Sequence, residues 1–454
     1  MKRSIVLFAL IGLISGCAKI ESLRYGEMRH RVVVESSTHA AFPDIVRLKT
    51  GEWMVVYRQG SGHVSPDGVI MRTVSTDQGK TWSEPDTIVN SVWDCRDPSV
   101  IQLEDGLILI SFFQSRYDEP GKAPAAVSCF VVRSFDNGKS FTAPRRITMP
   151  GVEWSATSAK ILTYSDGTLL MPVYGGNAGE KSRAMAVISR DGGDTWTEIV
   201  TVARDPGQRI DFQEPCFVLS PSGSIVCLMR TAGADDYLYR VQSSDGGRSW
   251  NAPASTSIQG QAPGCLVTPD GIMVCAYRDF WPRGVSYSIS YNDGITWEAE
   301  TQIWSAAGDC AYPSLIGDTG DRVHAVYYEE TVTLTDQKSY IRSTAFVVGR
   351  PHAPFGVHAS FFAGTGVQIR WNHVEGAVYY LVYRGMEPDF NPQGGYPRTG
   401  NAIASPTESR FTDRSVQGGA TYYYRITAVA TRGAPMENRG GESPASDAVE
   451  VIVQ

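Results

Sequence analysis

Short runs of alternating apolar and polar residues fill the first three quarters of the chain, and no stretch keeps a helical period. About every 50 residues, a loop appears in which an Asx-type turn and a Gly precede an aromatic residue. Its clearest copy is Ser189–Trp196, which reads SRDGGDTW. The other copies of this octet are Ser75–Trp82, Ser134–Phe141, Ser243–Trp250 and Ser290–Trp297. The recurrence predicts a repeated unit of short antiparallel strands.

The octet has the composition of a hairpin connection. Its Asp suits hydrogen bonds to nearby backbone amides, its Gly can take a positive φ, and its aromatic residue can pack under the loop. It has no metal-ligand spacing. We therefore predict a structural role for the octets.

A second signal comes before each octet: a Pro or small residue begins an apolar strand, and a turn then leads to another apolar strand. The six starts are Phe42–Asp44, Arg96–Pro98, Glu153–Ser155, Gln213–Pro215, Gln261–Pro263 and Ala311–Pro313. Six starts and five octets predict six units, so we expect an all-β fold with a six-bladed β-propeller over residues 31–350. The last unit is one strand short, and Arg31–Ser36 is expected to supply the missing strand and cover a free sheet edge.

The period changes near residue 350. Alternating strands around Trp371 and a Tyr-rich strand at Thr421–Ala430 fit a β-sandwich of about 100 residues. These segments resemble a fibronectin type III domain, which we expect at residues 351–454 as a spacer or a docking surface.

The N-terminus indicates export. Residues 1–17 have a charged start, an apolar run and a small-residue ending, which is typical of a signal peptide. The ending ISGC resembles a bacterial lipoprotein processing site, which implies lipidation of Cys17, residues 18–30 as a tether, and anchoring at the bacterial outer membrane or cell surface. The alternative is an ordinary cleaved signal with an incidental Cys. The seven later cysteines are odd in number and include no CxxC pair, so we expect buried free thiols.

The formal net charge of −7 argues against a nucleic-acid partner. It does not exclude a small anionic substrate, because arginines can cluster locally in an acidic protein.

In a propeller the first strands surround the axis, so one end of the ring gathers side chains from every unit. The repeat register places candidate groups from the first strands, the second strands and two loops there. The first-strand positions are Asp44, Asp97, Glu153, Glu214, Pro263 and Tyr312, the second-strand positions are Arg58, Gln114, Tyr174, Arg230, Arg278 and Glu329, and the loops add Asp67 and Arg283.

With these positions in place, the octets are identified as Asp-boxes, and residues 31–350 resemble the bacterial sialidase family of BNR (Asp-box) proteins. The resemblance implies Tyr312 as nucleophile, Glu214 as the base that takes its proton, and Asp67 as acid/base. Arg230 and Arg283 would clamp a substrate carboxylate through forked hydrogen bonds. Glu329 would orient an arginine.

One position departs from the family. The first carboxylate-binding arginine of sialidases lies in an R-I-P motif, and this chain has Ala41 there. Arg58, Arg96 and Arg278 are the candidate replacements.

The implied chemistry is retaining hydrolysis of a terminal sialic acid. A neutral phenol avoids the repulsion that a carboxylate nucleophile would meet at a sugar that carries its own carboxylate. This mechanism needs no metal and no organic cofactor. Each residue also has a plain structural interpretation: Tyr312 as packing, Glu214 as an acceptor for backbone amides, and Arg230 as an ion-pair partner.

Two other functions stay open. A glycosidase acting on a neutral sugar, in the manner of exo-arabinanases, would use Glu153 and Glu214 as a carboxylate pair. A non-catalytic glycan-binding protein would instead hold sugar with its arginines and with aromatic residues of the rim loops. The aromatic candidates are Trp93, Trp154, Phe280 and Trp281.

Overall fold

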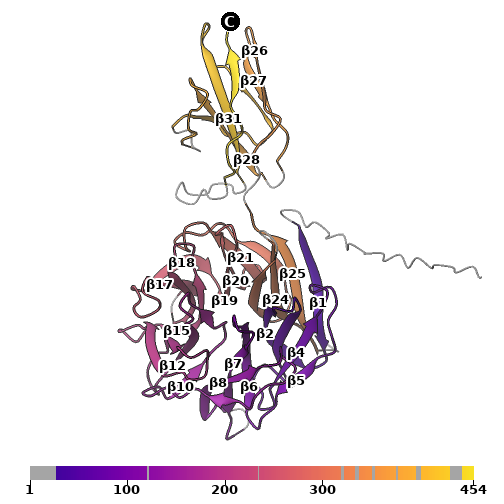
Figure 1. Ribbon diagram of the computed structural model, residues 1–454, viewed down its shortest axis with the longest axis vertical. Coiled ribbons are helices and arrows are strands. Elements are labelled where there is room, and N and C mark those ends of the chain that lie inside the picture. The colour runs from indigo at the N-terminus through magenta and orange to yellow at the C-terminus, as the bar shows by residue number, and fades with distance from the viewer. Residues whose placement is uncertain are drawn as a thin grey trace, which may run out of the picture.

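The computed structural model describes residues 27–119, 122–233, 235–318, 322–332, 337–349, 353–374, 377–394, 400–429 and 442–454. These residues form strands and loops and contain no helix, which confirms the all-β prediction. Figure 1 shows a ring of small sheets with a smaller body formed by the C-terminal part of the chain. The predicted signal peptide, Cys17 and most of the predicted tether lie outside the described residues.

Six small antiparallel sheets follow one another within the described part of residues 28–347. The first comprises β2 (His39–Arg47), β3 (Trp53–Gly60), β4 (Val69–Ser75) and β5 (Asp86–Val89). The second comprises β6 (Asp94–Gln102), β7 (Ile108–Arg116), β8 (Ala126–Ser134) and β9 (Arg145–Arg146). The third comprises β10 (Trp154–Ala156), β11 (Leu162–Thr163), β12 (Leu169–Gly176), β13 (Arg183–Ser189) and β14 (Glu198–Ala203).

The other three sheets repeat this order. The fourth comprises β15 (Asp211–Leu219), β16 (Ile225–Ala232), β17 (Tyr237–Ser243) and β18 (Ala254–Gln259). The fifth comprises β19 (Gln261–Val267), β20 (Met273–Phe280), β21 (Arg283–Ser290) and β22 (Thr301–Ser305). The sixth comprises β23 (Cys310–Gly317), β24 (Arg322–Val332), β25 (Gln337–Val347) and β1 (Met28–Ser36).

The N-terminal strand completes the sixth sheet. β1 pairs antiparallel with β25 from Met28, opposite Phe346, to Ser36, opposite Ser339. The pairing covers an edge that would otherwise expose unpaired backbone groups. The prediction that this segment supplies the missing strand is confirmed.

Each octet connects the third and fourth strands of its sheet. In Ser189–Trp196, the amide of Thr195 donates to Asp191 Oδ1 at 2.8 Å, and the amide of Gly193 donates to Ser189 Oγ at 2.9 Å. The same two bonds recur in the other four octets. Trp196 packs under its loop and is 7% exposed. The predicted structural role of the octets is confirmed.

Apolar cores fill the spaces between neighbouring sheets. One cluster joins Leu109 and Val131 of the second sheet to Met171 and Val187 of the third. The cysteines of the described residues are free thiols, and all except Cys265 are buried, as the sequence predicted.

The C-terminal residues form two further sheets. One contains β26 (His358–Phe362), β27 (Gly366–Arg370) and β30 (Arg410–Asp413). The other contains β28 (Tyr379–Gly385), β29 (Ala402–Ala404), β31 (Thr421–Val429) and β32 (Val449–Ile452). Their inner faces share one core around Trp371, which is 5% exposed.

Candidate active site

The first strands of five sheets bend at equivalent points. At each bend, two residues of the first strand lie opposite one residue of the second strand. The first of these two residues precedes a Pro and takes a positive φ. These residues are Phe42 (55°), Asp97 (47°), Glu214 (48°), Ala262 (50°) and Tyr312 (53°). Such a conformation costs about 1–3 kcal/mol in a non-Gly residue and is concentrated at functional sites. We call these five residues the inner bends.

The predicted first-strand positions were wrong in three sheets. Phe42 and Ala262, rather than Asp44 and Pro263, are equivalent to Glu214 and Tyr312, and Glu153 precedes β10. In each of the five bent sheets the equivalent residue is the one directly before a Pro. Asp44 lies beyond its bend and accepts hydrogen bonds from Lys160 and Ser314.

Tyr312 and Glu214 form a close pair. The phenol of Tyr312 donates to Glu214 Oε1 at 2.5 Å, and Arg230 Nη1 donates to the same oxygen at 3.1 Å. The other carboxylate oxygen accepts the amide of Ala262 at 3.1 Å. Burial, followed by the charge of Glu214, raises the pKa of Tyr312 well above its usual value. The structure thus brings three predicted site residues together as a neutral phenol held against a fixed base.

Three arginines surround this pair. Arg96, Arg230 and Arg278 each have a raised pKa, because neighbouring acidic groups outweigh the effect of burial, and Tyr312 is among those groups for all three. The exposed fractions of their side chains are 11%, 27% and 22%. They therefore remain charged and can still be reached from solvent.

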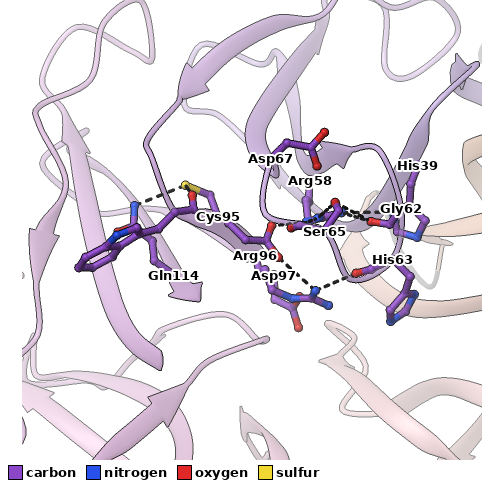
Figure 2. Close-up of polar contacts among 12 residues, drawn as sticks. His39, Arg58, Gly62, His63, Ser65, Asp67, Cys95, Arg96, Asp97 and Gln114 are labelled. Carbon is purple, nitrogen blue, oxygen red and sulfur yellow. Dashed lines mark hydrogen bonds and ion pairs between the residues drawn. The ribbon is translucent and has the colours of Figure 1, made fainter. Parts of the chain in front are cut away.

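Arg58 does not belong to this accessible group. Its side chain is 0% exposed, and its Nε lies 2.8 Å from Asp94 Oδ1. It also donates to the carbonyl of Gly62 at 2.9 Å and to Ser65 Oγ at 2.8 Å (Figure 2). The prediction that Arg58 binds substrate was wrong, because its donors hold the loop between β3 and β4.

Asp67 lies on this same loop but is directed elsewhere. Its carboxylate accepts the backbone amide of Ser61 at 3.1 Å and the Ser61 hydroxyl at 3.0 Å. Burial acts to raise the pKa of Asp67, but hydrogen bonds from Ser65 and Ser61 outweigh it and lower the pKa. Figure 2 shows its side chain pointing away from Arg96 and Asp97. The structure does not bring Asp67 to the Tyr312–Glu214 pair.

Two further predicted residues, and the position of the missing arginine, make no hydrogen bond to the Tyr312–Glu214 pair within the described residues. Arg283 is exposed at the start of β21. Glu329 binds an arginine, as expected, but its partner is Arg342 and not one of the arginines around Tyr312. Ala41 is fully buried and pairs with Arg58 across β2 and β3.

Glu153 is also separate from Glu214. It is exposed before β10, and its carboxylate accepts the amide of Ala178 at 2.8 Å. Glu214 is 4% exposed and bonded to the inner groups described above. Glu214 lines the inner cavity and Glu153 is not part of that lining, so the geometry does not support the predicted pair.

The sequence interpretation missed a polar group beside the pair. Asp309 Oδ2 accepts the phenol of Tyr328 at 2.5 Å and lies 3.4 Å from His63 Nδ1. Asp309 Oδ1 lies 3.0 Å from Arg278 Nη2, which also donates to Tyr328 Oη at 3.0 Å. Burial acts to raise the pKa of Asp309, but these partners lower it. Tyr328 adjoins the predicted Glu329, whereas His63 and Asp309 lie in loops and match no repeat position.

Asp97, at an inner bend, carries a further acidic group. Burial raises its pKa to about 7, with Arg96 opposing this shift and the charge of Glu214 adding to it. Its Oδ1 has no hydrogen-bond partner within the described residues, and the nearest Arg96 nitrogen is 4.0 Å away. Asp97 is therefore a candidate carboxylic acid at neutral pH.

A cavity of about 260 Å³ runs along the inner strands. Residues of β2, β6, β15, β19 and β23 and of the segment 158–162 line it, so all six sheets contribute. Asp97, Glu214 and Tyr312 are part of this lining. The bends thus bring side chains from distant parts of the sequence to one hollow.

The described residues offer neither a cluster of metal ligands nor a membrane-spanning helix. They contain no group of three or more His, Cys, Asp or Glu side chains placed to hold a metal ion. They also contain no helix that is long and apolar enough to cross a membrane.

Comparison with known proteins places the ring in a family. Residues 51–325, more than half of the chain, match the BNR repeat-like domain. The chain belongs to this family. A protein of unknown function from Dyadobacter fermentans, known from its crystal structure, is 26% identical over 71% of this chain and 99% of its own, with a TM-score of 0.64.

Solved glycosidases share the fold of this BNR repeat-like domain at lower identity. The Hadza microbial sialidase Hz136 is 18% identical over 68% of this chain and 66% of its own, with a TM-score of 0.55. The α-L-arabinanase of Penicillium chrysogenum is 15% identical over 70% of this chain and 98% of its own, with a TM-score of 0.55. Both neighbours have propeller-like folds, so the likeness supports a glycosidase-like architecture.

A sequence relative covers a smaller part. The poly(3-hydroxybutyrate) depolymerase of Ralstonia pickettii is 29% identical over 140 residues, or 30% of this chain. The match spans about a quarter of that protein, 24% of its length.

Proposed function

We propose that this protein is an exo-acting glycoside hydrolase of the sialidase type, which releases terminal sialic acid from glycans with retention of configuration. The observation that carries the proposal is the hydrogen bond of 2.5 Å from the phenol of Tyr312 to Glu214. A half-buried phenol paired with a carboxylate and an arginine has the parts of a nucleophile, its base and a charge stabiliser.

In the proposed reaction, Tyr312 Oη attacks the anomeric carbon while its proton passes to Glu214 Oε1. The raised pKa of Tyr312 keeps the phenol neutral until this transfer, so it does not repel the substrate carboxylate. Water then hydrolyses the tyrosyl intermediate, and Glu214 returns the proton to the departing phenol.

The proposed carboxylate site uses the arginines that surround Tyr312. Arg230 and Arg278 approach from the second strands of the fourth and fifth sheets, and Arg96 from the first strand of the second sheet. Guanidinium groups suit a carboxylate because their donors form a fork. Arg96 and Arg278 would take the place of the arginine missing at Ala41, and the exposed Arg283 would have no part in the clamp.

The test compares the wild type with Tyr312→Phe on an α-sialoside and on an α-L-arabinofuranoside. We expect the wild type to hydrolyse the sialoside, with NMR showing the α-anomer released first, and Tyr312→Phe to lose about 10³-fold or more in kcat. Sialoside turnover that survives the substitution would refute the mechanism. Binding without any sugar release would favour a non-catalytic glycan-binding protein.

A second candidate is a two-carboxylate glycosidase acting on a neutral sugar, with Asp97 in the place predicted for Glu153. The raised pKa of Asp97, close to the charge of Glu214, favours one protonated and one ionised carboxyl group at neutral pH. Arabinofuranoside hydrolysis that Asp97→Asn abolishes and Tyr312→Phe spares would select this candidate.

The wider architecture and the location are part of the same proposal. The six sheets support a six-bladed propeller, and the two C-terminal sheets around Trp371 support a fibronectin type III-like domain. We propose export and a lipid anchor at Cys17, with the residues before it removed as a signal peptide and the residues from Cys17 to the start of β1 at Met28 as the tether. Metabolic labelling with a radioactive fatty acid, lost in Cys17→Ser, checks the anchor.

A further inference from the structure

The loop between β3 and β4 is held from beneath by a buried ion-pair cluster. Arg58 and Arg96 both bind Asp94, at 2.8 and 3.3 Å, and Arg96 donates to the carbonyl of His63 at 2.7 Å (Figure 2). A Cβ on Gly68 would lie 1.9 Å from Asp94 Oδ1, so the end of the loop packs directly on the cluster. Moving the loop would leave buried charges without partners, which is costly.

This fixed loop directs its two titratable side chains differently. Asp67 folds back onto Ser61, as described above. The ring of His63 instead packs edge-on against Phe42 at 5.2 Å between ring centres, and Phe42 lies 4.8 Å from the ring of Tyr312. The ring of Phe42 thus connects His63 to Tyr312, and the His63 side chain, which is 42% exposed, still reaches solvent.

The surroundings of His63 suit a proton donor. Its Nδ1 lies at ion-pair distance from Asp309, an acid that Tyr328 and Arg278 hold in place. A carboxylate on one nitrogen fixes the orientation of an imidazole and stabilises its protonated form. This contact leaves Nε2 as the atom that can face a substrate. The charged or titratable groups around His63 and its partner are Asp309, His39, Arg96, Arg58, Arg278 and Tyr328.

We propose that His63, oriented by Asp309, is the general acid/base of this site, in the role that the family resemblance gives to Asp67. The inference rests on the proposed sialidase-type function. As the bond from the anomeric carbon to the leaving oxygen breaks, its electron pair stays on oxygen, which takes the proton of His63 Nε2. The neutral imidazole then accepts a proton from the water that attacks the tyrosyl intermediate, so one water is consumed per turnover.

The experiment uses leaving groups of different basicity. 3′-Sialyllactose has a poor leaving group that needs protonation, whereas 4-nitrophenyl α-sialoside has a good one that does not. For His63→Gln we expect kcat/KM on sialyllactose to fall about 10²–10⁴-fold, with a much smaller loss on the nitrophenyl substrate.

Two variants serve as comparisons. Asp67→Asn should retain kcat/KM on both substrates, because its carboxylate is bound to Ser61. His358→Gln, at an exposed position of β26, should match the wild type. A second variant, His63→Ala, is assayed with added imidazole, and recovery of sialyllactose turnover supports the proposal even if the glutamine variant folds poorly.

Several outcomes would overturn the inference. Equal losses on both substrates would remove His63 from proton transfer, and a selective loss in Asp67→Asn would return the role to Asp67. If the wild type is active and Tyr312→Phe is not, these results leave the proposed function standing and reject only the role of His63. A wild type inactive on both sialosides overturns both proposals.

Discussion

Two sets of recurring loops in the ring differ in what they keep constant. The octets at the ends of the third strands keep both backbone and side chains, so that each Asp or Asn bonds the amide four residues later. The inner bends keep only the backbone: five of them share a positive φ, but they present Phe, Asp, Glu, Ala and Tyr. The octet side chains therefore recur because each of the five loops needs the same hydrogen bonds to hold its own fold. The side chains at the inner bends differ because the sheets contribute different groups to one shared site.

The two sets also differ in electrostatics. The bonds from Thr195 lower the pKa of Asp191 in the octet to about 2, whereas burial raises the pKa of Asp97 at a bend to about 7. The octet carboxylate is stabilised as an anion, and the bend holds its carboxyl group against ionisation. The octets thus add to the folding stability, whereas the inner bends lower it.

The strongest test of this comparison changes the side chain at an inner bend and leaves the backbone as it is. Glu214→Gln keeps the side-chain shape but removes the base, so we expect sialoside kcat to fall about 10³-fold with little change in the unfolding midpoint. Glu153→Gln, which changes an exposed carboxylate outside the bends, should keep full activity. Equal losses in the two variants would contradict the division of roles.

The next effect is on the pH dependence of folding stability, for which Asp97 and the octet Asp191 should act in opposite directions. Because the folded-state pKa of Asp97 is raised from 3.8 to about 7, its contribution to stability is present below pH 4 and lost as the pH rises to 7. Asp97→Asn should flatten this fall in the free energy of unfolding, which amounts to about 1.4 kcal/mol for each pH unit that separates the folded and unfolded pKa values. Urea unfolding of both proteins from pH 4 to 8 measures it. An unchanged slope would show that Asp97 is ionised in the folded protein.

Replacing a guanidinium should have a moderate effect on activity alone. Arg230→Lys keeps the charge but loses the fork, so we expect about a 10- to 100-fold loss in kcat/KM on a sialoside, corresponding to one charged hydrogen bond. Arg283→Lys, at an exposed position at the start of β21, should change kcat/KM little. If Arg283→Lys shows the larger loss, the carboxylate clamp lies where the sequence resemblance put it.

An octet substitution should cost stability and spare chemistry. Asp191→Ala leaves the amide of Thr195 and the hydroxyls of Thr195 and Ser189 without their acceptor, so we expect a loss of about 1 kcal/mol in the free energy of unfolding and unchanged kcat. Because the pKa of Asp191 is lowered to about 2, this difference should shrink as the pH falls from about 4 to 2. Glu84→Ala, at an exposed residue after the first octet, provides the control. A fall in kcat for Asp191→Ala would link the outer loops to the site.

The sequence predicted the repeated parts better than the shared ones. The octets, the all-β fold and the closing strand β1 follow from local composition and apolar spacing. The sequence placed three site residues together correctly: Tyr312, Glu214 and Arg230. The register is simple there because a Glu-Pro or Tyr-Pro pair marks the bend in the first strand of the sheet.

The errors occur where local patterns carry no information. The sequence interpretation put the inner position of the first sheet at Asp44, whereas the bend lies at Phe42. The direction of Arg58 depends on Asp94, 36 residues away. Loop conformation decided that the ring of His63 packs on Phe42, which contacts Tyr312, whereas Asp67 bonds Ser61, and no repeat constrains either residue.

The pairing of β1 with β25 has a consequence for how the chain folds during synthesis. Met28 emerges from the ribosome early but finds its partner, Phe346, only after all the intervening sheets have been made. The sixth sheet therefore cannot be completed before nearly the whole ring has been synthesised, and its strand edges stay exposed until then. The first strand of the chain is the last to find its place, which makes the nascent ring most vulnerable to aggregation just before it closes.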